Sequence, residues 1–350
     1  MAARTAIGLD IGTSVVRAVE LSYGRAGISL ERFGQVVLPP DVVSDGEVIE
    51  PEPVIACLRH LWKATGLSHH KVVLGVANQR VIVRQVELPW MEPAELRTSL
   101  AFHVADYLPM HVSDSVLDFF PLQETVGPDE SRQLAGLLVA ASRSTVLANV
   151  TCVERAGLSV QSVDLTSFAV LRSLGRQQGA DVETEALIDV GARITNIVVH
   201  RAGVPLFVRI LPMGGQDVTD AVAQALDVPT SEAEAMKQQI ALAGDGPQAE
   251  ALRDTVGMTS QDFVDEVSGS LDYFAAANPS IRLQRILVTG GGSRLDGLLE
   301  RLGAEIRLPV VAGDPMANLR IGDTGLGSDQ LDFVRPLSAV PVGLAMGGIR

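Results

Sequence analysis

One sequence pattern occurs twice, about half a chain apart, and it constrains the fold more than any other feature. The first copy, Leu9–Ser14, reads apolar, Asp, apolar, Gly and two small residues, and the second copy, Ile188–Arg193, begins with the same four types. Apolar and β-branched residues precede and follow each copy. Each copy therefore predicts a tight turn between two strands. The repetition predicts two similar domains that face each other.

Length, charge and cysteine content narrow the possible classes. With 350 residues and 47% apolar residues, the chain is long enough for two cores, because domains usually hold about 100–200 residues. Its net charge of −14 and the lack of a Lys/Arg-rich run disfavour nucleic-acid binding and direct docking on anionic lipid. Cys57 and Cys152 form no CxxC pair, so we expect reduced thiols rather than a disulfide framework.

The sequence also predicts that the chain does not insert into a membrane. Residues 1–5 lead directly into a strand, without the basic and apolar segments of a signal peptide. The apolar run 134–141 is far shorter than the roughly 18 residues that a spanning helix needs. We therefore expect a cytoplasmic protein that, if it works at a membrane, is taken there by something else.

We expect the division into domains to follow the duplicated pattern. The first domain is predicted over residues 1–170 and the second over residues 171–350. Residues 71–145 contain two alternating strand patterns, a helix opened by Pro93 and a returning strand. They predict a βαβ-type insert subdomain in the first domain. A C-terminal helix at about residues 336–350 is expected to pack back on the first domain.

The first turn carries groups that suit a phosphate and a divalent cation. Gly12, Thr13 and Ser14 can aim several backbone N–H groups at one point, and small residues let a phosphate come close. Arg17 adds a cation for the same phosphate. Asp10 stands just before the turn, where a carboxylate would repel phosphate unless a divalent cation lay between them. An ordinary β-hairpin without a ligand is the alternative.

The second turn offers a matching set from the other domain. Asp189, Gly191 and Thr195 supply the acid, the turn glycine and a hydroxyl donor. Mg²⁺ keeps several waters and takes few protein ligands. Two carboxylates acting through waters therefore suit one Mg²⁺ and one triphosphate clamped from both sides. Arg193 is bulkier than expected at such a turn, so it either reaches a phosphate or crowds it.

Two further patterns extend the candidate site. Gly290–Ser293 follows the apolar strand 286–288, and a strand, a Gly-rich turn and a helix commonly bring backbone N–H groups near a nucleotide. A plain tight turn is the alternative. Glu234 and Lys237 lie three residues apart, so they share one helix face. They either contribute to the site or form a surface ion pair.

In this order, the motifs resemble those of the actin, chaperone and sugar-kinase superfamily of ATPases. Within it they resemble the PilM family of type IV pilus assembly proteins, with the FtsA family as near relatives. The resemblance is carried along nearly the whole chain by Ile7–Leu21, Val86–Pro89, Tyr107–Pro109, Ala156–Leu158, Met213–Gly215 and Val342–Ala345. It implies an α/β fold of the actin-like, ribonuclease H-like type, with two domains and an insert subdomain of the FtsA/PilM type.

The resemblance also implies roles for individual residues. Asp10 and Asp189 would organise Mg²⁺ beside a bound ATP or ADP. The phosphates would be held by Gly12, Thr13, Ser14, Arg17, Gly191 and Thr195. The ribose and adenine would be surrounded by Gly214, Gly215, Glu234, Lys237, Gly290, Gly291, Gly292 and Ser293. Asp164, near the end of a strand, is the candidate group for orienting the attacking water, and at most a slow ATPase is expected.

The partner implied by the resemblance is the cytoplasmic N-terminal tail of a PilN-like inner-membrane protein. It would bind in a groove between about Lys71 and Val170, and the motor ATPases of the pilus machine are further expected partners. The alternatives are an FtsA-like filament-forming ATPase at the membrane and a small-molecule kinase of the same superfamily. Residues 342–350, with three glycines and one basic residue, lack the pattern of a membrane-surface helix. No acid is clearly placed for a kinase.

Overall fold

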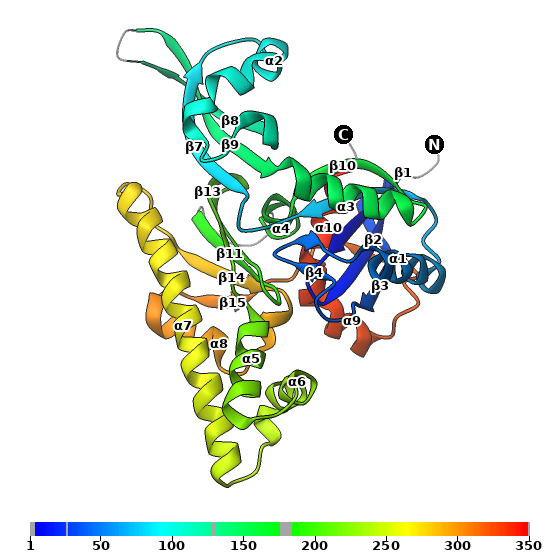
Figure 1. The fold of residues 1–350 in the computed structure, drawn as a ribbon. Coiled ribbons are helices and arrows are strands. Elements are labelled where there is room, and N and C mark those ends of the chain that lie inside the picture. The colour runs from blue at the N-terminus through cyan, green and yellow to red at the C-terminus, as the bar shows by residue number, and fades with distance from the viewer. Residues whose placement is uncertain (1–3, 26, 128–129, 176–183, 349–350) are drawn as a thin grey trace.

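Two mixed β-sheets form the centres of the two halves of the molecule (Figure 1). The computed structural model describes residues 4–25, 27–127, 130–175 and 184–348. The first sheet has the strand order β10-β6-β1-β2-β3-β16. Its strands are β1 (Arg4–Ile11), β2 (Val15–Gly24), β3 (Gly27–Val37), β6 (Lys71–Val76), β10 (Ser159–Leu165) and β16 (Arg320–Ile321). Antiparallel pairing joins β1, β2 and β3, whereas β6 and β10 run parallel to β1.

The second sheet repeats this arrangement in the order β13-β12-β11-β14-β15. Its strands are β11 (Thr184–Val190), β12 (Thr195–Arg201), β13 (Val204–Leu211), β14 (Arg285–Thr289) and β15 (Val310–Ala312). The strands β11, β12 and β13 are antiparallel, and β14 and β15 are parallel to β11. The strand β11 therefore corresponds to β1, and β12 to β2. The duplication expected from the two turn patterns is present as two similar sheets.

A separate antiparallel sheet of three strands stands at the top of Figure 1. It contains β7 (Ile82–Pro89), β8 (Ser115–Val126) and β9 (Arg132–Ser142), and α2 (Pro93–His103) packs on it. The strand β6 belongs to the first sheet, so this insert sheet begins at Ile82 rather than at residue 71. The strand β6 is buried along almost its whole length. This burial suits a parallel strand in the interior of the first sheet rather than a strand of the insert.

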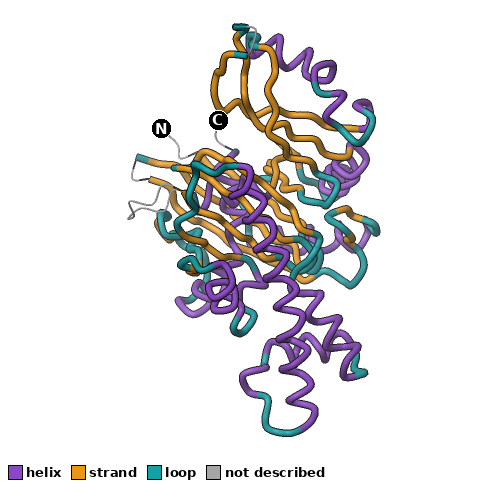
Figure 2. Tube along the Cα trace, turned by 90° about the vertical axis from the view of Figure 1, so that its left-hand side faces the viewer, coloured by secondary structure: helices purple, strands orange, loops and turns teal. Residues whose placement is uncertain are grey.

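Helices cover the outer faces of the two main sheets. On the first sheet lie α1 (Pro51–Thr65) and α3 (Arg143–Arg155), and the short strands β4 (Val43–Ser44) and β5 (Glu47–Val48) precede α1. On the second sheet lie α7 (Pro247–Ala277) and α8 (Leu298–Ile306). A helical extension at the lower end of Figure 2 contains α5 (Gly215–Leu226), α6 (Thr230–Gln238) and the first part of α7. Among the described residues, no helix is both long and apolar enough to cross a membrane.

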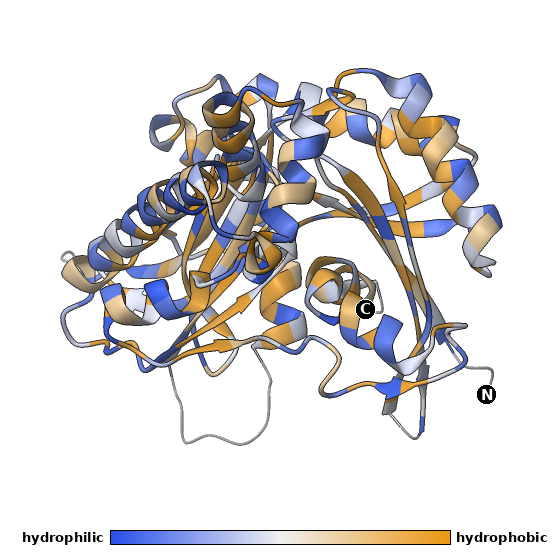
Figure 3. Cartoon of the chain, turned by 90° about the horizontal axis from the view of Figure 1, so that it is seen from below, coloured by the Kyte–Doolittle hydropathy of each residue, from blue (hydrophilic) through white to orange (hydrophobic). Residues whose placement is uncertain are grey.

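Two helices lie between the sheets and join them. These helices, α4 (Thr166–Leu174) and α10 (Ala339–Gly347), pack against each other, and α10 also contacts β1, β2 and β6. One buried cluster contains side chains of both sheets and both helices, among them Val73, Leu187, Val198, Leu287, Val170, Val340 and Leu344. Figure 3 shows apolar residues gathered on the inner elements of both halves. This shared core sets the position of one half relative to the other.

Glycines let α10 lie directly on neighbouring backbone. A Cβ atom at Gly343 would stand 1.8 Å from the carbonyl oxygen of Ala169 in α4. A Cβ atom at Gly8 in β1 would stand 2.1 Å from the carbonyl oxygen of Pro341. These distances leave no room for a side chain, so α10, α4 and β1 approach backbone to backbone.

The packing at Gly343 predicts the effect of one added methyl group. Gly343→Ala should destabilise the protein by about 2 kcal/mol or more, because the methyl must push α10 away from α4. Gly269→Ala is the matched control, since a Cβ at Gly269 on α7 meets nothing within 4 Å, and alanine there should be neutral or add up to about 1 kcal/mol. Urea unfolding of both variants tests this. An unchanged midpoint for Gly343→Ala would contradict the packing described.

Candidate functional site

Two aspartates, Asp189 buried and Asp10 largely buried, lie where the central strands of the two sheets end. Asp10 is near the end of β1, and Asp189 is near the end of β11. Burial, together with the negative charge of Asp10, raises the pKa of Asp189 to about 6. Burial also raises the pKa of Asp10, while the charge of Arg17 acts in the opposite direction. Carboxylates that repel each other in a desolvated space form an environment that a cation would stabilise.

Each aspartate faces a different residue across its hairpin. Asp10 pairs in register with Arg17, and Asp189 pairs in register with Asn196. A guanidinium nitrogen of Arg17 lies 4.0 Å from Oδ2 of Asp10, and Nδ2 of Asn196 donates to Oδ2 of Asp189 at 3.3 Å. Asn196 was not among the residues predicted from sequence. It follows Asp189 at the same distance along the chain at which Arg17 follows Asp10, and the antiparallel register places each of them opposite its aspartate.

Asn196 ties Asp189 to the start of α4. Its Oδ1 atom accepts hydrogen bonds from the hydroxyl groups of Thr166 at 3.0 Å and Ser167 at 2.7 Å. Both hydroxyl residues and Asn196 are buried. A buried network therefore runs from the acid of the second sheet to the helix that lies between the sheets.

The two turns have the same geometry. The N–H of Gly12 donates to the carbonyl oxygen of Val15 at 3.0 Å, and the N–H of Gly191 donates to that of Ile194 at 3.0 Å. A Cβ at Gly191 would stand 2.5 Å from the oxygen of Ile194, so this turn requires glycine. Thr13 is half-buried and Ser14 is exposed, which leaves the first turn open to a ligand.

The start of α5 packs on the second turn. The N–H of Gly215 donates to the carbonyl oxygen of Gly191 at 2.9 Å, and a Cβ at Gly214 would stand 2.4 Å from the same oxygen. Nζ of Lys237 donates to the oxygen of Gly215 at 2.9 Å and lies 2.6 Å from Glu234. The Lys237 side chain is only 12% exposed. The ion pair therefore belongs to a partly buried cluster beside the turn and is not a surface pair.

The Gly290–Ser293 turn lies directly beside Asp189. Gly290 has φ 87°, a backbone conformation that favours glycine. A Cβ there would stand 2.8 Å from Oδ1 of Asp189 and 2.4 Å from the oxygen of Val190. The following residues form a 3₁₀ turn, Gly291–Arg294. The structure thus brings this motif to the acid pair.

Two residues expected at the phosphates point elsewhere. Thr195 is fully buried, and its hydroxyl donates to the carbonyl oxygen of Met213 at 2.8 Å. Arg193 pairs with Asp217 at 3.0 Å and with Asp220 at 2.5 Å, both in α5. Thr195 therefore serves the packing of the second turn, and Arg193 is held on α5 rather than at a phosphate.

Asp164 also differs from its expected role. Its carboxylate forms an ion pair with Arg172 of α4, and Nε of Arg172 donates to the carbonyl oxygen of Gly343 at 2.8 Å. The pair ties β10 to α4 and α10. Asp164 therefore has a structural ion pair in place of the water-orienting position that the sequence suggested.

The polar groups present fit a hydrated Mg²⁺ with a phosphate. Nε of Arg17 is buried and has no hydrogen-bond partner within the described part of the chain, so the site holds an unused donor for an anion. Burial, with a smaller contribution from the positive charge of Arg17, lowers the pKa of Arg294, and a phosphate would relieve the repulsion between the two arginines. Among the described residues, no group of three or more His, Cys, Asp or Glu gathers at one point. Two carboxylates suit Mg²⁺, which keeps most of its waters.

Comparison with known proteins adds sequence and structural relatives. Residues 8–349 match the family model described as type IV pilus assembly protein PilM. A solved structure described as a PilM-PilN type IV pilus biogenesis complex has a TM-score of 0.86 and 26% identity, over 99% of this chain and 98% of that chain. Cell division protein FtsA of Pseudomonas aeruginosa is 25% identical over 98% of this chain and 89% of its own length.

A more distant structure shows the breadth of the fold. MreB5 of Spiroplasma citri, described as bound to ADP, has a TM-score of 0.53 and 13% identity, over 97% of this chain and 94% of that chain. At this identity the likeness concerns the fold alone. Together, these relatives establish that the chain has the actin-like ATPase fold with an α/β architecture.

The raised pKa of Asp189 predicts how stability changes with pH. The folded state holds this proton more tightly than the unfolded state, whose carboxyl has a pKa near 3.8, so stability is lost as pH rises from about 4 through about 6. Without divalent cations, Asp189→Asn should raise the free energy of unfolding at pH above 7 by on the order of 2 kcal/mol, and this gain should vanish near pH 4.

Urea unfolding over a pH series, with and without Mg²⁺, measures this effect. Mg²⁺ should stabilise the wild-type protein more than the variant. Asp262→Asn, an exposed position on α7, is the control and should shift nothing. An equal stability difference for Asp189→Asn at both ends of the pH range would contradict the raised pKa.

Proposed function

Because the chain belongs to the family of the type IV pilus assembly protein PilM, we propose that it is a nucleotide-binding scaffold of the pilus machine that grips a partner peptide. The observation that carries the nucleotide part is the pair of the largely buried Asp10 and the buried Asp189 with Arg17 beside it. Each half of the molecule supplies one aspartate. The pair is therefore complete only while α4 and α10 hold the halves together.

The proposed ligand is ATP or ADP with Mg²⁺, bound between the two turns. Asp10 and Asp189 would hold Mg²⁺ through waters, and Arg17 with the backbone of the first turn would hold the phosphates. The ribose and adenine would be lined by Gly214, Gly215, Glu234, Lys237 and the Gly290–Ser293 turn. When bound, Mg²⁺ offsets the repulsion between the carboxylates and the phosphates. The description of the MreB5 relative as bound to ADP supports a nucleotide in this fold.

The nucleotide would act by selecting a conformation rather than by rapid hydrolysis. A fast ATPase needs a group that orients the attacking water, and Asp164 is committed to Arg172. Thr166 and Ser167 donate to Asn196, and a neutral hydroxyl is too weakly basic to act as a general base in place of a carboxylate. A ligand that binds one arrangement of the two halves better than another shifts the population toward it. We therefore propose a slow ATPase at most.

The proposed partner is the cytoplasmic N-terminal tail of a PilN-like inner-membrane protein. The solved relative is described as a PilM-PilN complex, and the insert sheet offers apolar surface for a peptide. Phe120 of β8 is 41% exposed and its ring lies 5.9 Å from that of Phe168 in α4, while Val116 is 40% exposed. These residues support a groove between about Lys71 and Val170. Binding such a tail would keep the chain at the inner face of the cytoplasmic membrane.

The contact between Phe120 and Phe168 also suggests how the nucleotide would affect the partner. Phe168 follows Thr166 and Ser167 at the start of α4, and these two residues hold Asn196 and through it Asp189. A change at the acid pair would therefore reach the insert through one short helix. The motor ATPases of the pilus machine are proposed as further partners on the basis of the family alone.

The two arginines of the matching hairpins provide a test of the nucleotide site. Arg17→Ala should weaken the affinity for ATP with Mg²⁺ by about tenfold or more, because the phosphate would lose the partly buried guanidinium that holds it. Arg193→Ala should change it by less than about threefold, because Arg193 is paired with Asp217 and Asp220. Asp10→Ala should weaken binding with Mg²⁺ and have little effect without it. Calorimetric titration measures all three, and equal losses for both arginine variants would sink the assignment.

Binding of the partner is tested with a synthetic peptide that carries the N-terminal residues of a PilN-like protein. Calorimetry with and without ATP and Mg²⁺ should give a Kd of about 10 μM or tighter, with a difference between the two states. Phe120→Ser should weaken peptide binding without changing ATP binding. Absence of peptide binding in both states, combined with ATP-dependent pelleting, would favour instead the filament-forming alternative that the likeness to FtsA supports.

A further inference from the structure

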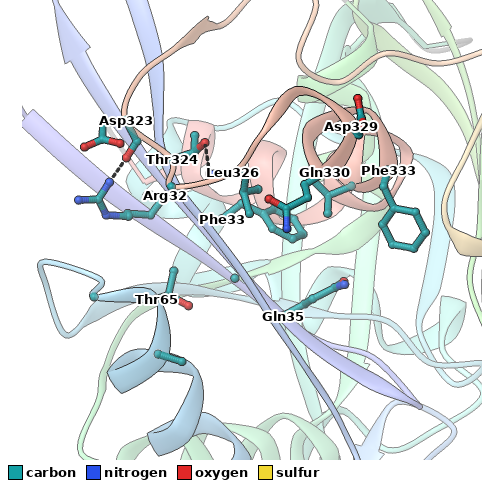
Figure 4. Close-up of a pocket in the computed structure, with 15 residues that line it drawn as sticks. Arg32, Phe33, Gln35, Thr65, Asp323, Thr324, Leu326, Asp329, Gln330 and Phe333 are labelled. Atoms are coloured by element: carbon teal, nitrogen blue, oxygen red, sulfur yellow. Dashed lines mark hydrogen bonds between the residues drawn. The ribbon is translucent and has the colours of Figure 1, made fainter.

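A groove with a cavity volume of about 840 Å³ runs along the outer edge of β3 (Figure 4). Its floor is formed by Arg32–Gln35 of β3. One wall is the end of α1, residues 64–66, and the other is the loop 323–326 with α9 (Ser328–Val334). The lining residues include neither aspartate of the acid pair nor any other residue of the proposed nucleotide site. The groove is therefore a separate feature.

The edge of β3 in this groove has no partner strand among the described residues. The short strand β16 pairs with β3 only as far as Leu30, after which β3 has a bulge. The N–H of Leu38 donates to the carbonyl oxygen of Ser14 at 2.8 Å, so the backbone groups of Leu38 point toward β2. Backbone groups alternate in direction along a strand. Those of Phe33 and Gln35 therefore point outward into the groove, where an added strand would pair with them.

The groove has a wall on each face of the sheet. On one side, α1 lies so close to β3 that a Cβ at Gly34 would stand 2.1 Å from Oγ1 of Thr65. On the other side, Phe33 packs in one cluster with Val334 of α9, and Phe333 is 56% exposed at the rim. Because α1 and α9 stand on opposite faces of the sheet, a second sheet that carries its own covering helices could not reach the edge of β3. One strand of a peptide fits between them.

The charge of the groove favours a basic peptide. Asp323 and Asp329 line the α9 wall and are both exposed. The guanidinium of Arg32 keeps its positive charge but is held in place, because it donates to the carbonyl oxygens of Asp323 and Glu31. The two carboxylates outweigh this one cation in the lining, on a chain with a net charge of −14. Cytoplasmic segments next to membrane spans are enriched in Lys and Arg, so they have the matching chemistry.

We infer that this groove binds an extended, Lys/Arg-containing segment of a partner protein, which adds as a strand to the edge of β3. The backbone of the segment pairs with Phe33 and Gln35, its apolar side chains lie against Phe333 and Leu326, and a basic side chain meets Asp323 or Asp329. Strand addition to an open sheet edge is a recurring mode of peptide recognition. The inference concerns a different surface from the insert groove and does not depend on nucleotide binding.

A proline substitution tests the backbone pairing itself. The probe is a fluorescent peptide of sequence Lys-Val-Thr-Val-Lys-Val with blocked ends, titrated into the full chain. Gln35→Pro removes the outward N–H, and proline is tolerated on an edge strand where the N–H faces away from its neighbour. Gln35→Thr keeps that N–H and is the matched control. We expect Gln35→Pro to weaken binding at least about tenfold and Gln35→Thr less than about threefold.

Hydrogen exchange supplies a second readout. The peptide should slow exchange of the Phe33 and Gln35 amides, and Asp329→Lys should reduce this protection. If Gln35→Pro does not fold, peptides N-methylated at alternate positions replace it, because methylation should abolish binding only for amides that face β3. No protection at about 1 mM peptide, or equal binding by Gln35→Pro, would overturn the inference. If a peptide with Glu in place of Lys bound equally well, the partner would not need to be basic, and that part of the inference would be overturned. If the chain formed a dimer that Gln35→Pro abolished, the groove would bind a second copy of the chain instead of a partner protein.

Discussion

The close packing of α10 against β1 and α4 is the contact on which the rest of the structure depends. Gly8 and Gly343 remove the side chains that would keep these backbones apart, and one apolar cluster then joins both sheets. Neither sheet contains the pair of aspartates by itself, since Asp10 belongs to one and Asp189 to the other. The separation of the two carboxylates is therefore a property of the helices between the sheets. A small shift of α4 against α10 would alter that separation before it altered either hairpin.

The two hairpins share a turn but differ in the residue opposite the aspartate, and this difference has an electrostatic reason. Arg17 offsets part of the charge of Asp10 and keeps an unused donor. A second arginine in place of Asn196 would neutralise Asp189 and remove the need for a cation. The amide of Asn196 leaves Asp189 with its raised pKa and uses its other end to hold α4. In the proposed function, the first hairpin would contact the ligand, and the second would connect the ligand to α4.

The sequence predicts those parts of the site that depend on local geometry. The sequence predicts the turns that contain Asp10, Gly12, Asp189 and Gly191, because a turn and its flanking residues form one continuous pattern. The glycine turn that begins at Gly290 was predicted in the same way. Asn196 became visible only through the register of β11 and β12. The contacts of Thr195, Arg193 and Asp164 could not be predicted, because their partners Met213, Asp217 and Arg172 come from separate elements. The insert was found, but β6 was grouped with it because a buried strand does not reveal which sheet it joins.

The position of α10 in the chain has a consequence for the order in which the protein is built. Gly8 of β1 meets Pro341 and Ala345 of α10 across almost the whole sequence, and a ribosome that adds roughly 5–20 residues per second makes α10 on the order of tens of seconds after β1. During this interval the face of the first sheet around Gly8, Val73 and Gly75 lacks the helix that covers it. The half of the molecule that is synthesised first is therefore completed last. Its uncovered face is the surface that a nascent-chain chaperone would shield.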